Sequence, residues 1–396
     1  MNHNMKRTLR SLLLLSSLLL LTASCHRGKK TGGAFSTDTP QAGAYEQALL
    51  TVEDARLFSI ENLEVGHRAC VFTPSGDTLA RYLLLPKEAA SQYTAAANEK
   101  VIIVPLQRMA LLSDTFIGAA ELLEAMEQVV ATSDTSTLYN EVACSRARSG
   151  QLQGVSPAGI TNAEQLVALS PDGIMMNYFE GSEHSLSLPA SSQIPIIYNN
   201  DWQESTPLGR AEWIKFIGLL FGKGETASKI YQETKNRYEA LRQKVFQQSE
   251  SPAPRVLFGQ AYKGVWYLPA EDSYVASFLR DAGAAFKGSA VGAPGVPISF
   301  EQVFLDHAED DVWLAWHSAD IRSYDDFLKQ DKRYSRFKPF KERCIWLNSK
   351  RVRGTANDYF EQGPYKPDVI LGDLVYIFHS ALMPSDFIPS YWQRLE

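Results

Sequence analysis

The residue types that carry out catalysis occur in this chain, but their spacing matches no catalytic motif. No two of the seven histidines stand four residues apart, as a metal-binding pair on one helix face would. The sequence contains no HExxH, GxSxG, phosphate-loop or glycine-rich dinucleotide motif. We therefore predict no catalytic residue, no cofactor and no metal-ligand set, and we expect a protein that is not an enzyme.

Aromatic side chains are more informative, because several stand where predicted strands or loops end. A Trp or Tyr at such a position offers a ligand a flat apolar face and one polar atom. The alternative for each is an aromatic residue of the core. That alternative is weakest for Trp202 and Tyr359, since their neighbours favour loops. The candidate ligand-binding residues are Tyr178, Trp202, Trp266, Tyr267, Trp316 and Tyr359.

Arginines near the predicted strand ends are a second group of candidates. Arg108 follows the strand-like run KVIIVP, and Arg146 and Arg148 lie in a polar stretch. A guanidinium can hold a carboxylate or a catecholate–iron complex by paired hydrogen bonds. Arg108 is therefore a candidate anion clamp, with a solvated surface charge as the alternative.

The first half of the chain, which must position these residues, alternates strands with helices. Residues 56–105 contain four short β-rich runs separated by Pro, Gly and Asn. Helical spacing follows at 116–126 and at 162–169, and apolar runs at 174–179 and 194–199 indicate strands. This alternation predicts an α/β lobe with a mainly parallel sheet.

The middle of the chain carries the longest helical signal. Residues 210–221 form one amphipathic segment, and after a Gly-Lys-Gly break residues 225–248 place Ala227, Tyr231 and Tyr238 on one face. A helix over 225–248 would extend about 36 Å, enough to bridge two lobes. A second α/β pattern runs from the strand RVLFG to the closing helix DVILGDLVYIFHSAL. The predicted fold class is α/β, with two lobes of mainly parallel sheets joined by one long α-helix.

The first 25 residues form a different kind of segment. Lys6, Arg7 and Arg10 precede an apolar run at 11–21, and the small-residue ending LTASC closes at Cys25. This pattern resembles a bacterial lipoprotein signal, in which Cys25 would be lipidated and become the mature N-terminus. An uncleaved anchor helix is disfavoured, because the apolar run is short for a membrane span. The predicted organisation is a signal peptide at 1–24, a flexible tether at 25–50, an N-terminal lobe at 51–204, a helical connector at 205–250 and a C-terminal lobe at 251–396.

Composition and charge exclude other classes of protein. Of the 396 residues 45% are hydrophobic and 21% charged, as in globular proteins, and the net charge of -6 gives no basic field for nucleic acid.

Besides Cys25, the chain has Cys70, Cys144 and Cys344. Three cysteines at wide spacing make neither a disulfide framework nor a metal knuckle, so we expect buried free thiols, with one disulfide as the alternative.

One short unit occurs in both halves of the chain. The first copy is NAEQLVALSPDGIMM at 162–176, and the second is SFEQVFLDHAEDDVWLA at 299–315. Each copy has a polar residue able to cap a helix, then Glu, Gln and an aliphatic residue, an acidic turn and an apolar run. Glu164 and Glu301 hold equivalent positions near a helix start, where a carboxylate also favours the helix dipole.

The order of signal, lobe, long helix and lobe resembles the helical-backbone class of substrate-binding proteins, which serve ABC importers of iron–siderophores, haem and cobalamin. The resemblance covers most of residues 56–379, and is carried by AELLEAMEQVVATS, both copies of the repeated unit and NDYFEQGPYKPDVILGDL. NDWQESTPLGRAEWIKF at 200–216 resembles versions of the family seen in Bacteroidetes-like lipoproteins. The chain departs from the family in the turn of the second repeat, and in a strand-rich stretch before Pro105 that is longer than a minimal member needs.

The resemblance implies a periplasmic protein, held at a bacterial membrane through Cys25, that binds cargo between its lobes. Delivery would be to a permease dimer with its ATPase, and Glu164 and Glu301 match the two carboxylates with which the family docks onto permease arginines. An aromatic cleft favours an iron chelate, either a siderophore complex or haem, and cobalamin is the alternative. From other classes, a chelatase-like enzyme would need a His–Glu pair in the cleft. A surface adhesion or scaffold lipoprotein would not need the paired glutamates.

Overall fold

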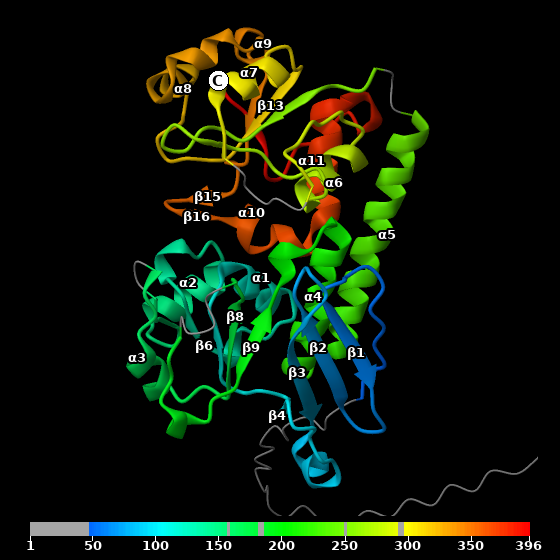
Figure 1. Ribbon diagram of the computed structural model, residues 1–396, viewed down its shortest axis with the longest axis vertical. Coiled ribbons are helices and arrows are strands. Elements are labelled where there is room, and N and C mark those ends of the chain that lie inside the picture. The colour runs from blue at the N-terminus through cyan, green and yellow to red at the C-terminus, as the bar shows by residue number, and fades with distance from the viewer. Residues whose placement is uncertain (1–46, 157–158, 181–185, 249–251, 292–296) are drawn as a thin grey trace, which may run out of the picture. The chain divides into compact units, whose positions relative to one another are not determined.

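The computed structural model in Figure 1 describes residues 47–156, 159–180, 186–248, 252–291 and 297–396. The predicted signal peptide, Cys25 and most of the predicted tether lie outside the described residues. Among the helices that are described, none has both the length and the apolar content that a membrane span needs.

The N-terminal lobe is built on a five-stranded parallel sheet with strand order β7-β6-β5-β8-β9. Every residue of β5 and β6 is buried, as expected when both faces of a parallel sheet are covered. Because all five strands run the same way, their carboxyl ends lie along one edge, where the following loops meet. The strands are β5 (Met109–Leu111), β6 (Val129–Thr132), β7 (Gln153–Gly154), β8 (Gly173–Asn177) and β9 (Ile196–Asn199).

Polar caps fix the start of two helices in this lobe. Asn140 accepts a hydrogen bond from the Ala143 N–H (2.7 Å) at the start of α2, and Asn162 accepts one from the Gln165 N–H (3.0 Å) at the start of α3. Each cap satisfies a helix N–H that has no partner within the helix. The short helix predicted to follow Asn162 is confirmed. The helices are α1 (Asp114–Leu122), α2 (Glu141–Arg148) and α3 (Ala163–Ala168).

A second sheet of four strands precedes the parallel one in the chain. Strands β1, β2 and β3 pair antiparallel, and β4 is parallel to β3. The Tyr82 hydroxyl links the two sheets, because it accepts from the Tyr198 N–H (2.8 Å) and donates to the Ile196 carbonyl (3.3 Å). The four β-rich runs predicted between 56 and 105 are confirmed. They are β1 (Phe58–Asn62), β2 (His67–Phe72), β3 (Thr78–Leu85) and β4 (Glu99–Ile103).

Helix α4 (Pro207–Leu220) begins the connector and is buried almost all round. Thr206 caps it by accepting a hydrogen bond from the Gly209 N–H (3.0 Å). Arg210, Glu212 and Lys215 stand on this otherwise apolar helix, and each has an ion-pair partner. Charged groups in apolar surroundings need such partners, because an unpaired buried charge is strongly destabilising.

Helix α5 (Gly224–Gln248) is the longest of the described helices. Gly222, with a φ of +70°, turns the chain between α4 and α5. The buried stripe of α5 includes Tyr231 and Tyr238, as the spacing predicts. Because α5 contacts α4 and also α6 and α11 of the C-terminal lobe, one long helix joins the lobes.

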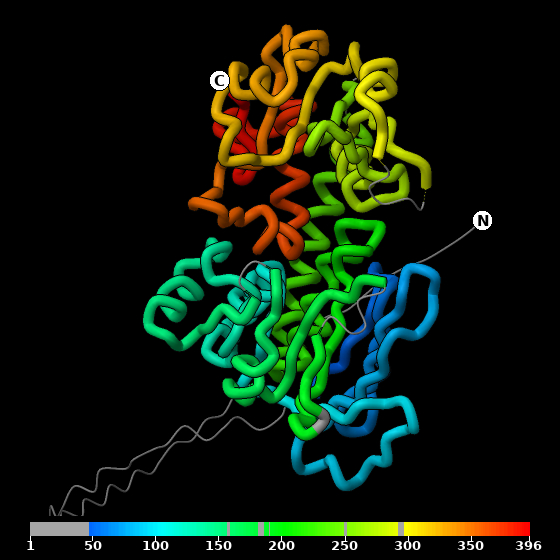
Figure 2. Tube along the Cα trace, turned by 60° about the vertical axis from the view of Figure 1, so that its left-hand side comes forward, coloured from blue at the N-terminus to red at the C-terminus, as the bar shows by residue number. Residues whose placement is uncertain are grey.

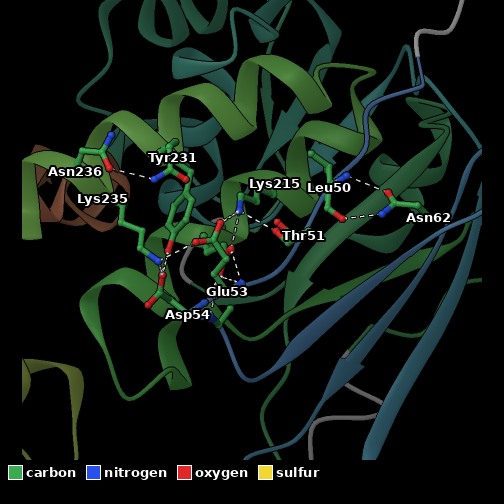
Figure 3. Close-up of polar contacts among 12 residues, drawn as sticks. Leu50, Thr51, Glu53, Asp54, Asn62, Lys215, Tyr231, Lys235 and Asn236 are labelled. Carbon is green, nitrogen blue, oxygen red and sulfur yellow. Dashed lines mark hydrogen bonds and ion pairs between the residues drawn. The ribbon is translucent and has the colours of Figure 1, made fainter. Parts of the chain in front are cut away.

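A network of polar contacts fastens the segment before β1 to the connector (Figure 3). Glu212, fully buried, accepts hydrogen bonds from the backbone N–H groups of residues 53–55 at 2.7–3.0 Å. The Lys215 ammonium lies 2.7 Å from the Glu212 carboxylate and donates to the Thr51 carbonyl at 2.8 Å. Glu204 accepts two more N–H groups, those of residues 56 and 57, at 2.9–3.1 Å. We call Glu204, Glu212 and Lys215, with the segment 51–57 that they hold, the entry clamp.

Helix α5 adds further contacts to the entry clamp (Figure 3). Lys235 pairs with Glu53 (2.9 Å) and with Asp54 (2.6 Å), and the Tyr231 hydroxyl donates to Asp54. The Lys215 ammonium lies 4.3 Å from the centre of the Tyr231 ring. The hydrogen bond from Lys235 lowers the pKa of the Glu53 carboxyl. The clamp therefore couples the chain entering the N-terminal lobe to both connector helices.

The C-terminal lobe has a four-stranded sheet with order β10-β13-β14-β17. The first three strands are parallel, and β17 is antiparallel at the edge. Every residue of β10 and β13 is buried. The predicted fold class, two α/β lobes with mainly parallel sheets and one long helix between them, is confirmed. The strands are β10 (Val256–Phe258), β13 (Val312–Ala315), β14 (Ile345–Leu347) and β17 (Gln393–Arg394).

Six α-helices and two short antiparallel strand pairs complete the described part of this lobe. Ser299 caps α7 by accepting a hydrogen bond from the Gln302 N–H (3.2 Å), so the second copy of the repeated unit opens like the first. The strand pairs are β11 (Trp266–Tyr267) with β12 (Pro297–Ile298), and β15 (Val352–Arg353) with β16 (Ala356–Asn357). The helices are α6 (Tyr274–Asp281), α7 (Phe300–His307), α8 (Tyr324–Gln330), α9 (Lys338–Lys341), α10 (Asp358–Glu361) and α11 (Pro367–Phe378).

The three described cysteines, Cys70, Cys144 and Cys344, are free thiols. Burial raises the pKa of each thiol, so all three are protonated at neutral pH. The prediction of free thiols is confirmed. Each is half-buried, however, and not fully buried as predicted.

Candidate functional site

At the carboxyl edge of the N-terminal sheet, two aromatic pairs lie at the ends of β8 and β9. Tyr178 packs edge-on against Tyr198, with 5.7 Å between the ring centres. Phe179, which is 50% exposed, lies 5.0 Å from the ring of Trp202 on the 3-10 turn η6 (Asp201–Gln203). Two of the candidate residues, Tyr178 and Trp202, are thus placed on neighbouring loops of one edge.

The corresponding edge of the C-terminal sheet carries a larger aromatic cluster. Trp316 directly follows β13 and lies 5.8 Å from the Tyr359 ring and 5.5 Å from the Phe360 ring. Phe360 is 45% exposed, whereas Tyr359 is 6% exposed and also packs on Tyr391 and Trp392. Trp316 and Phe360 therefore have surface to offer a ligand, and Tyr359 mainly supports them.

A cavity of about 770 Å³ lies between η6 and the start of α6. Trp202 and Gln203 line it from one side, and Ser273 and Tyr274 from the other. The Trp202 Nε1–H and the Gln203 Oε1 are buried and have no hydrogen-bond partner among the described residues. Few buried donors and acceptors in folded proteins lack partners, and these two belong to residues that line a cavity of ligand size.

A nearly buried ion pair joins the elements around this cavity. Arg210 of α4 donates through Nε to Asp201 (2.9 Å), which is 1% exposed. The same guanidinium lies 4.9 Å from the centre of the Tyr274 ring. Burial raises the pKa of the Asp201 carboxyl, although the positive charge of Arg210 opposes the rise. Because Asp201 precedes Trp202 on η6, this pair fixes the loop that carries Trp202 against α4 and α6.

Buried polar atoms without partners recur along both carboxyl edges. In the N-terminal lobe they include Thr132 Oγ1 at the end of β6 and Asn177 Oδ1 at the end of β8. In the C-terminal lobe they include His317 Nδ1 and Asn348 Nδ2, which follow β13 and β14. Burial lowers the pKa of His317, so its ring is neutral at neutral pH. Folded proteins leave few such atoms, and bound water or a ligand is their usual partner.

Arg108 lies away from these edges. It directly precedes β5 and is therefore at the amino end of the parallel sheet. Its guanidinium donates to the carbonyls of Leu169 (2.6 Å) and Ser170 (3.3 Å), which follow α3. The run KVIIVP that precedes Arg108 includes all but the first residue of β4, a strand of the second sheet. The end of this run therefore does not mark the carboxyl edge of the parallel sheet. The Arg108 guanidinium thus donates hydrogen bonds to carbonyl groups at the end of a helix. It does not lie at the carboxyl edges, where an anion clamp was expected.

Trp266 and Tyr267 point to opposite faces of β11 and have different surroundings. Trp266 is 1% exposed, stacks on Trp313 with 5.7 Å between ring centres, and donates from Nε1 to the Phe258 carbonyl at 3.0 Å. It is a residue of the core and is not retained as a ligand contact. Tyr267 is 45% exposed, and among the described residues no ring contact links it to the two aromatic clusters.

Sequence reasoning missed Arg210 and Tyr274. Arg210 had a detectable signal, since a charged residue in PLGRAEWIKFIGLL needs a buried partner and Asp201 stands nine residues earlier. Tyr274 had no comparable signal, because its position depends on how α6 meets α4.

Glu164 and Glu301 are the second residues of α3 and α7, and both are exposed. Glu164 has no ion-pair partner within the described part of the chain. Glu301 has a 3.2 Å contact with Arg333, and its side chain is 77% exposed. The helices lead into β8 and β13, so the two carboxylates hold equivalent places in the two lobes.

The C-terminal lobe contacts the N-terminal lobe through α10 and the β15–β16 pair (Figure 2). Glu361, 1% exposed, accepts the N–H groups of Tyr139 (2.7 Å) and Asn140 (2.9 Å) at the start of α2. Arg353 pairs with Glu141 of α2 at 2.6 Å. We call this set of contacts, from Arg353 and Glu361 to residues 139–141, the interlobe contact.

Close packing and burial both mark the interlobe contact. A Cβ on Gly118 of α1 would lie 2.0 Å from the Glu361 carbonyl, so the approach of α1 to α10 requires glycine. Burial raises the pKa of the Glu361 carboxyl to about 7. The two lobes therefore meet at a carboxyl group that titrates near neutral pH.

Comparison with known proteins gives the site a context. The family model described as "Periplasmic binding protein" matches residues 111–347. An uncharacterized lipoprotein of Methanocaldococcus jannaschii is 25% identical over 302 residues, which cover 71% of this chain and 67% of that protein.

Two solved structures share the fold at low sequence identity. A periplasmic haem-binding protein from Pseudomonas aeruginosa has a TM-score of 0.53 and 14% identity, covering 74% of this chain and 98% of its own. A protein of an ABC-type Fe3+-hydroxamate transport system from Saccharomonospora viridis has a TM-score of 0.51 and 15% identity, covering 69% of this chain and 94% of its own. These likenesses bear on the fold, and they extend beyond the segment that the family model matches.

Proposed function

Because the chain belongs to the family of periplasmic binding proteins, we propose that it captures an iron chelate between its lobes and delivers it to the permease of an ABC transporter. Proteins of this family serve transport as solute-binding proteins, and so no catalytic step is part of the proposal. The chelate is a siderophore complex or haem, and the iron is cargo.

One observation carries the proposal: aromatic faces and unpartnered polar atoms occur together at the carboxyl edges of both sheets. Trp316 and Phe360 offer flat surface in one lobe, and Tyr178 and Trp202 in the other. The cavity of about 770 Å³ beside Trp202 lies within the size range of ligand sites. A large ligand with a flat or ringed body and hydrogen-bonding groups at its rim matches this combination.

The choice of cargo rests on that chemistry and on the relatives of the fold. The Pseudomonas protein binds haem and the Saccharomonospora protein belongs to a ferric hydroxamate system, which favours a chelated iron for this chain as well. Cobalamin is the alternative cargo, since it has a similarly large ring system with polar side groups.

Docking and anchoring complete the proposed function. Glu164 and Glu301, one on each lobe, would each meet a basic side chain of a permease dimer, whose two similar halves offer two similar sockets. Cys25 would carry the lipid that holds the protein at the periplasmic face of a membrane. The Methanocaldococcus relative is named a lipoprotein, which supports this anchor.

A titration identifies the cargo. The chain without its first 25 residues is mixed with ferric haem, a ferric catecholate, a ferric hydroxamate and cyanocobalamin, and tryptophan fluorescence is followed. We expect one iron chelate to bind with a Kd of about 1 μM or below and the others at least about tenfold more weakly. Tight binding of cyanocobalamin alone would establish the alternative, and binding of none would refute the proposed cargo class.

A transport assay tests docking separately. Glu164→Ala, Glu301→Ala and the double variant are compared for uptake of the radioactive iron chelate by cells, and for chelate binding after purification. We expect unchanged binding, partial loss of uptake in each single variant and near-complete loss in the double variant. Full uptake in the double variant would show that the paired glutamates are not docking residues.

A further inference from the structure

The two copies of the repeated unit differ in the side chains around their glutamates. Glu164 and Glu301 are both the second residue of their helices. The first, fifth and sixth helical residues are Ala163, Val167 and Ala168 in α3, but Phe300, Phe304 and Leu305 in α7. The C-terminal copy thus carries large apolar side chains where the N-terminal copy carries small ones.

In the C-terminal lobe these side chains form an open groove of about 420 Å³. Phe300, Phe304 and Leu305 line it, and Glu301 belongs to the same lining. Leu305 is 77% exposed. Phe304 is half-buried and Phe300 is 5% exposed, so Leu305 and Phe304 give the groove its open apolar surface beside Glu301. An apolar surface next to a charged group is typical of a protein–protein contact surface. A partner that reaches Glu301 will therefore also cover the groove.

Two arginines hold the groove in shape. The guanidinium of Arg333 lies 3.9 Å from the centre of the Phe300 ring, and that of Arg336 lies 4.0 Å from the centre of the Phe304 ring. Side chains fixed before binding lose little entropy when a partner arrives. Arg333 also pairs with Asp331 at 2.7 Å, so its longer contact with the exposed Glu301, at 3.2 Å, is the weaker one. Glu301 can therefore accept a cation from a partner.

We infer that this groove is a second part of the permease-docking surface, where the permease buries an apolar side chain against Phe304 and Leu305 while a basic side chain meets Glu301. The inference rests on the proposed function and adds that the two docking points bind the permease with unequal strength. The C-terminal docking point combines apolar burial with an ion pair, whereas the N-terminal point offers Glu164 beside small side chains. Salt screens an exposed ion pair but not buried apolar surface. The C-terminal lobe is the tighter of the two points.

The test places the same charge at the same position of each lobe. Leu305→Asp and Ala168→Asp are introduced into the full-length protein, in cells that lack the native copy, and uptake of radioactive iron as haem and as a ferric hydroxamate is measured. We expect Leu305→Asp to lower uptake about tenfold or more, and Ala168→Asp about threefold at most. Purified forms of both variants should bind the chelate as the unaltered chain does, which shows that they fold.

A crosslinking experiment identifies the occupant of the groove. A photoreactive phenylalanine at position 305, irradiated in intact cells, should form an adduct with an integral membrane subunit of an ABC transporter, and Glu301→Ala should weaken that adduct. An adduct with a second copy of this chain would overturn the inference. The inference would also be overturned if Leu305→Asp and Ala168→Asp lowered uptake equally while the Glu164→Ala, Glu301→Ala double variant showed no uptake. Should that double variant transport normally, the failure would lie with the proposed docking function itself.

Discussion

The entry clamp and the carboxyl edges of the two sheets differ in whether their buried polar groups have hydrogen-bond partners. In the clamp, the carboxylates of Glu204 and Glu212 and the ammonium of Lys215 are all used by backbone groups or by opposite charges. Along the edges, Asn177 Oδ1 and Asn348 Nδ2 are among several buried atoms that have no partner within the described residues. An unmet hydrogen bond of a buried group costs about 1–3 kcal/mol. The satisfied region holds the fold together, and we infer that the unsatisfied one meets the ligand.

The largest expected effect comes from breaking the clamp. Glu212→Ala removes the acceptor of the backbone N–H groups of residues 53–55 and leaves the buried Lys215 ammonium without its nearest charge. We expect the free energy of unfolding to fall by about 3–5 kcal/mol, measured by urea denaturation, with chelate affinity per folded molecule unchanged. Glu225→Gln, on the exposed first turn of α5, is the control and should change stability by less than about 0.5 kcal/mol. A loss of chelate affinity in folded Glu212→Ala would remove the distinction between the regions.

The interlobe contact should respond to pH. The pKa of Glu361 is about 7 in the folded protein and near 4.5 when the group is exposed, so the folded form binds the proton more tightly. The stabilising contribution is therefore fully present below pH 4.5 and is lost as the pH rises to about 7, with a change of up to about 3 kcal/mol. Glu361→Gln should flatten this part of the pH dependence of the melting temperature. The exposed Glu309→Gln should leave it unchanged, and a pH profile that is identical in Glu361→Gln would contradict the expectation.

A smaller effect is expected from removing an aromatic ring at the carboxyl edge of the N-terminal sheet. This change should lower chelate affinity and leave stability nearly unchanged. Trp202→Ala removes a ring that lines the cavity beside η6 and leaves most of the core untouched. We expect chelate binding to weaken about thirtyfold, or about 2 kcal/mol, in a fluorescence or calorimetric titration. Phe246→Ala, an exposed aromatic near the end of α5, provides the matched control. Equal affinities for the two variants would exclude Trp202 from the site.

The smallest effect tests the reassignment of Arg108. Arg108→Gln loses hydrogen bonds to the carbonyls at the end of α3, which lie at the amino end of the sheet. We expect chelate affinity to stay within about twofold of the unaltered chain, because the residue does not face the carboxyl edges. A tenfold loss of affinity would restore Arg108 as an anion clamp.

The individual helices and strands could be predicted from the sequence because periodicity and capping are local properties. The spacing of apolar residues predicts the buried stripe of α5, which includes Tyr231 and Tyr238. The capping residue Asn162 predicts the start of α3. The four strand-like runs before Pro105 were also recognised, but not their pairing into a separate sheet. Strand pairing joins residues far apart in the chain, and spacing alone does not encode it.

The candidate site was only partly predictable for the same reason. Tyr178, Trp202 and Trp316 stand directly after strands of parallel sheets, where sequence order already indicates the edge. Trp266 also stands in a strand-like run, but its side chain lies on the inner face of β11, whereas that of the next residue, Tyr267, lies on the outer face. Sequence alone did not indicate which of two adjacent strand residues faces the core. Arg108 was misplaced because the strand before it belongs to the other sheet.

Hydrogen–deuterium exchange with and without the bound chelate tests the central claim most directly. We expect the chelate to slow exchange in peptides that cover residues 132–140, 199–206, 315–318 and 348–361, which contain the carboxyl edges and the interlobe contact. Peptides that cover the part of the clamp away from the cavity, at 51–55 and 212–215, should exchange at the same rate in both states. Protection of the clamp without protection of the carboxyl edges would contradict the account.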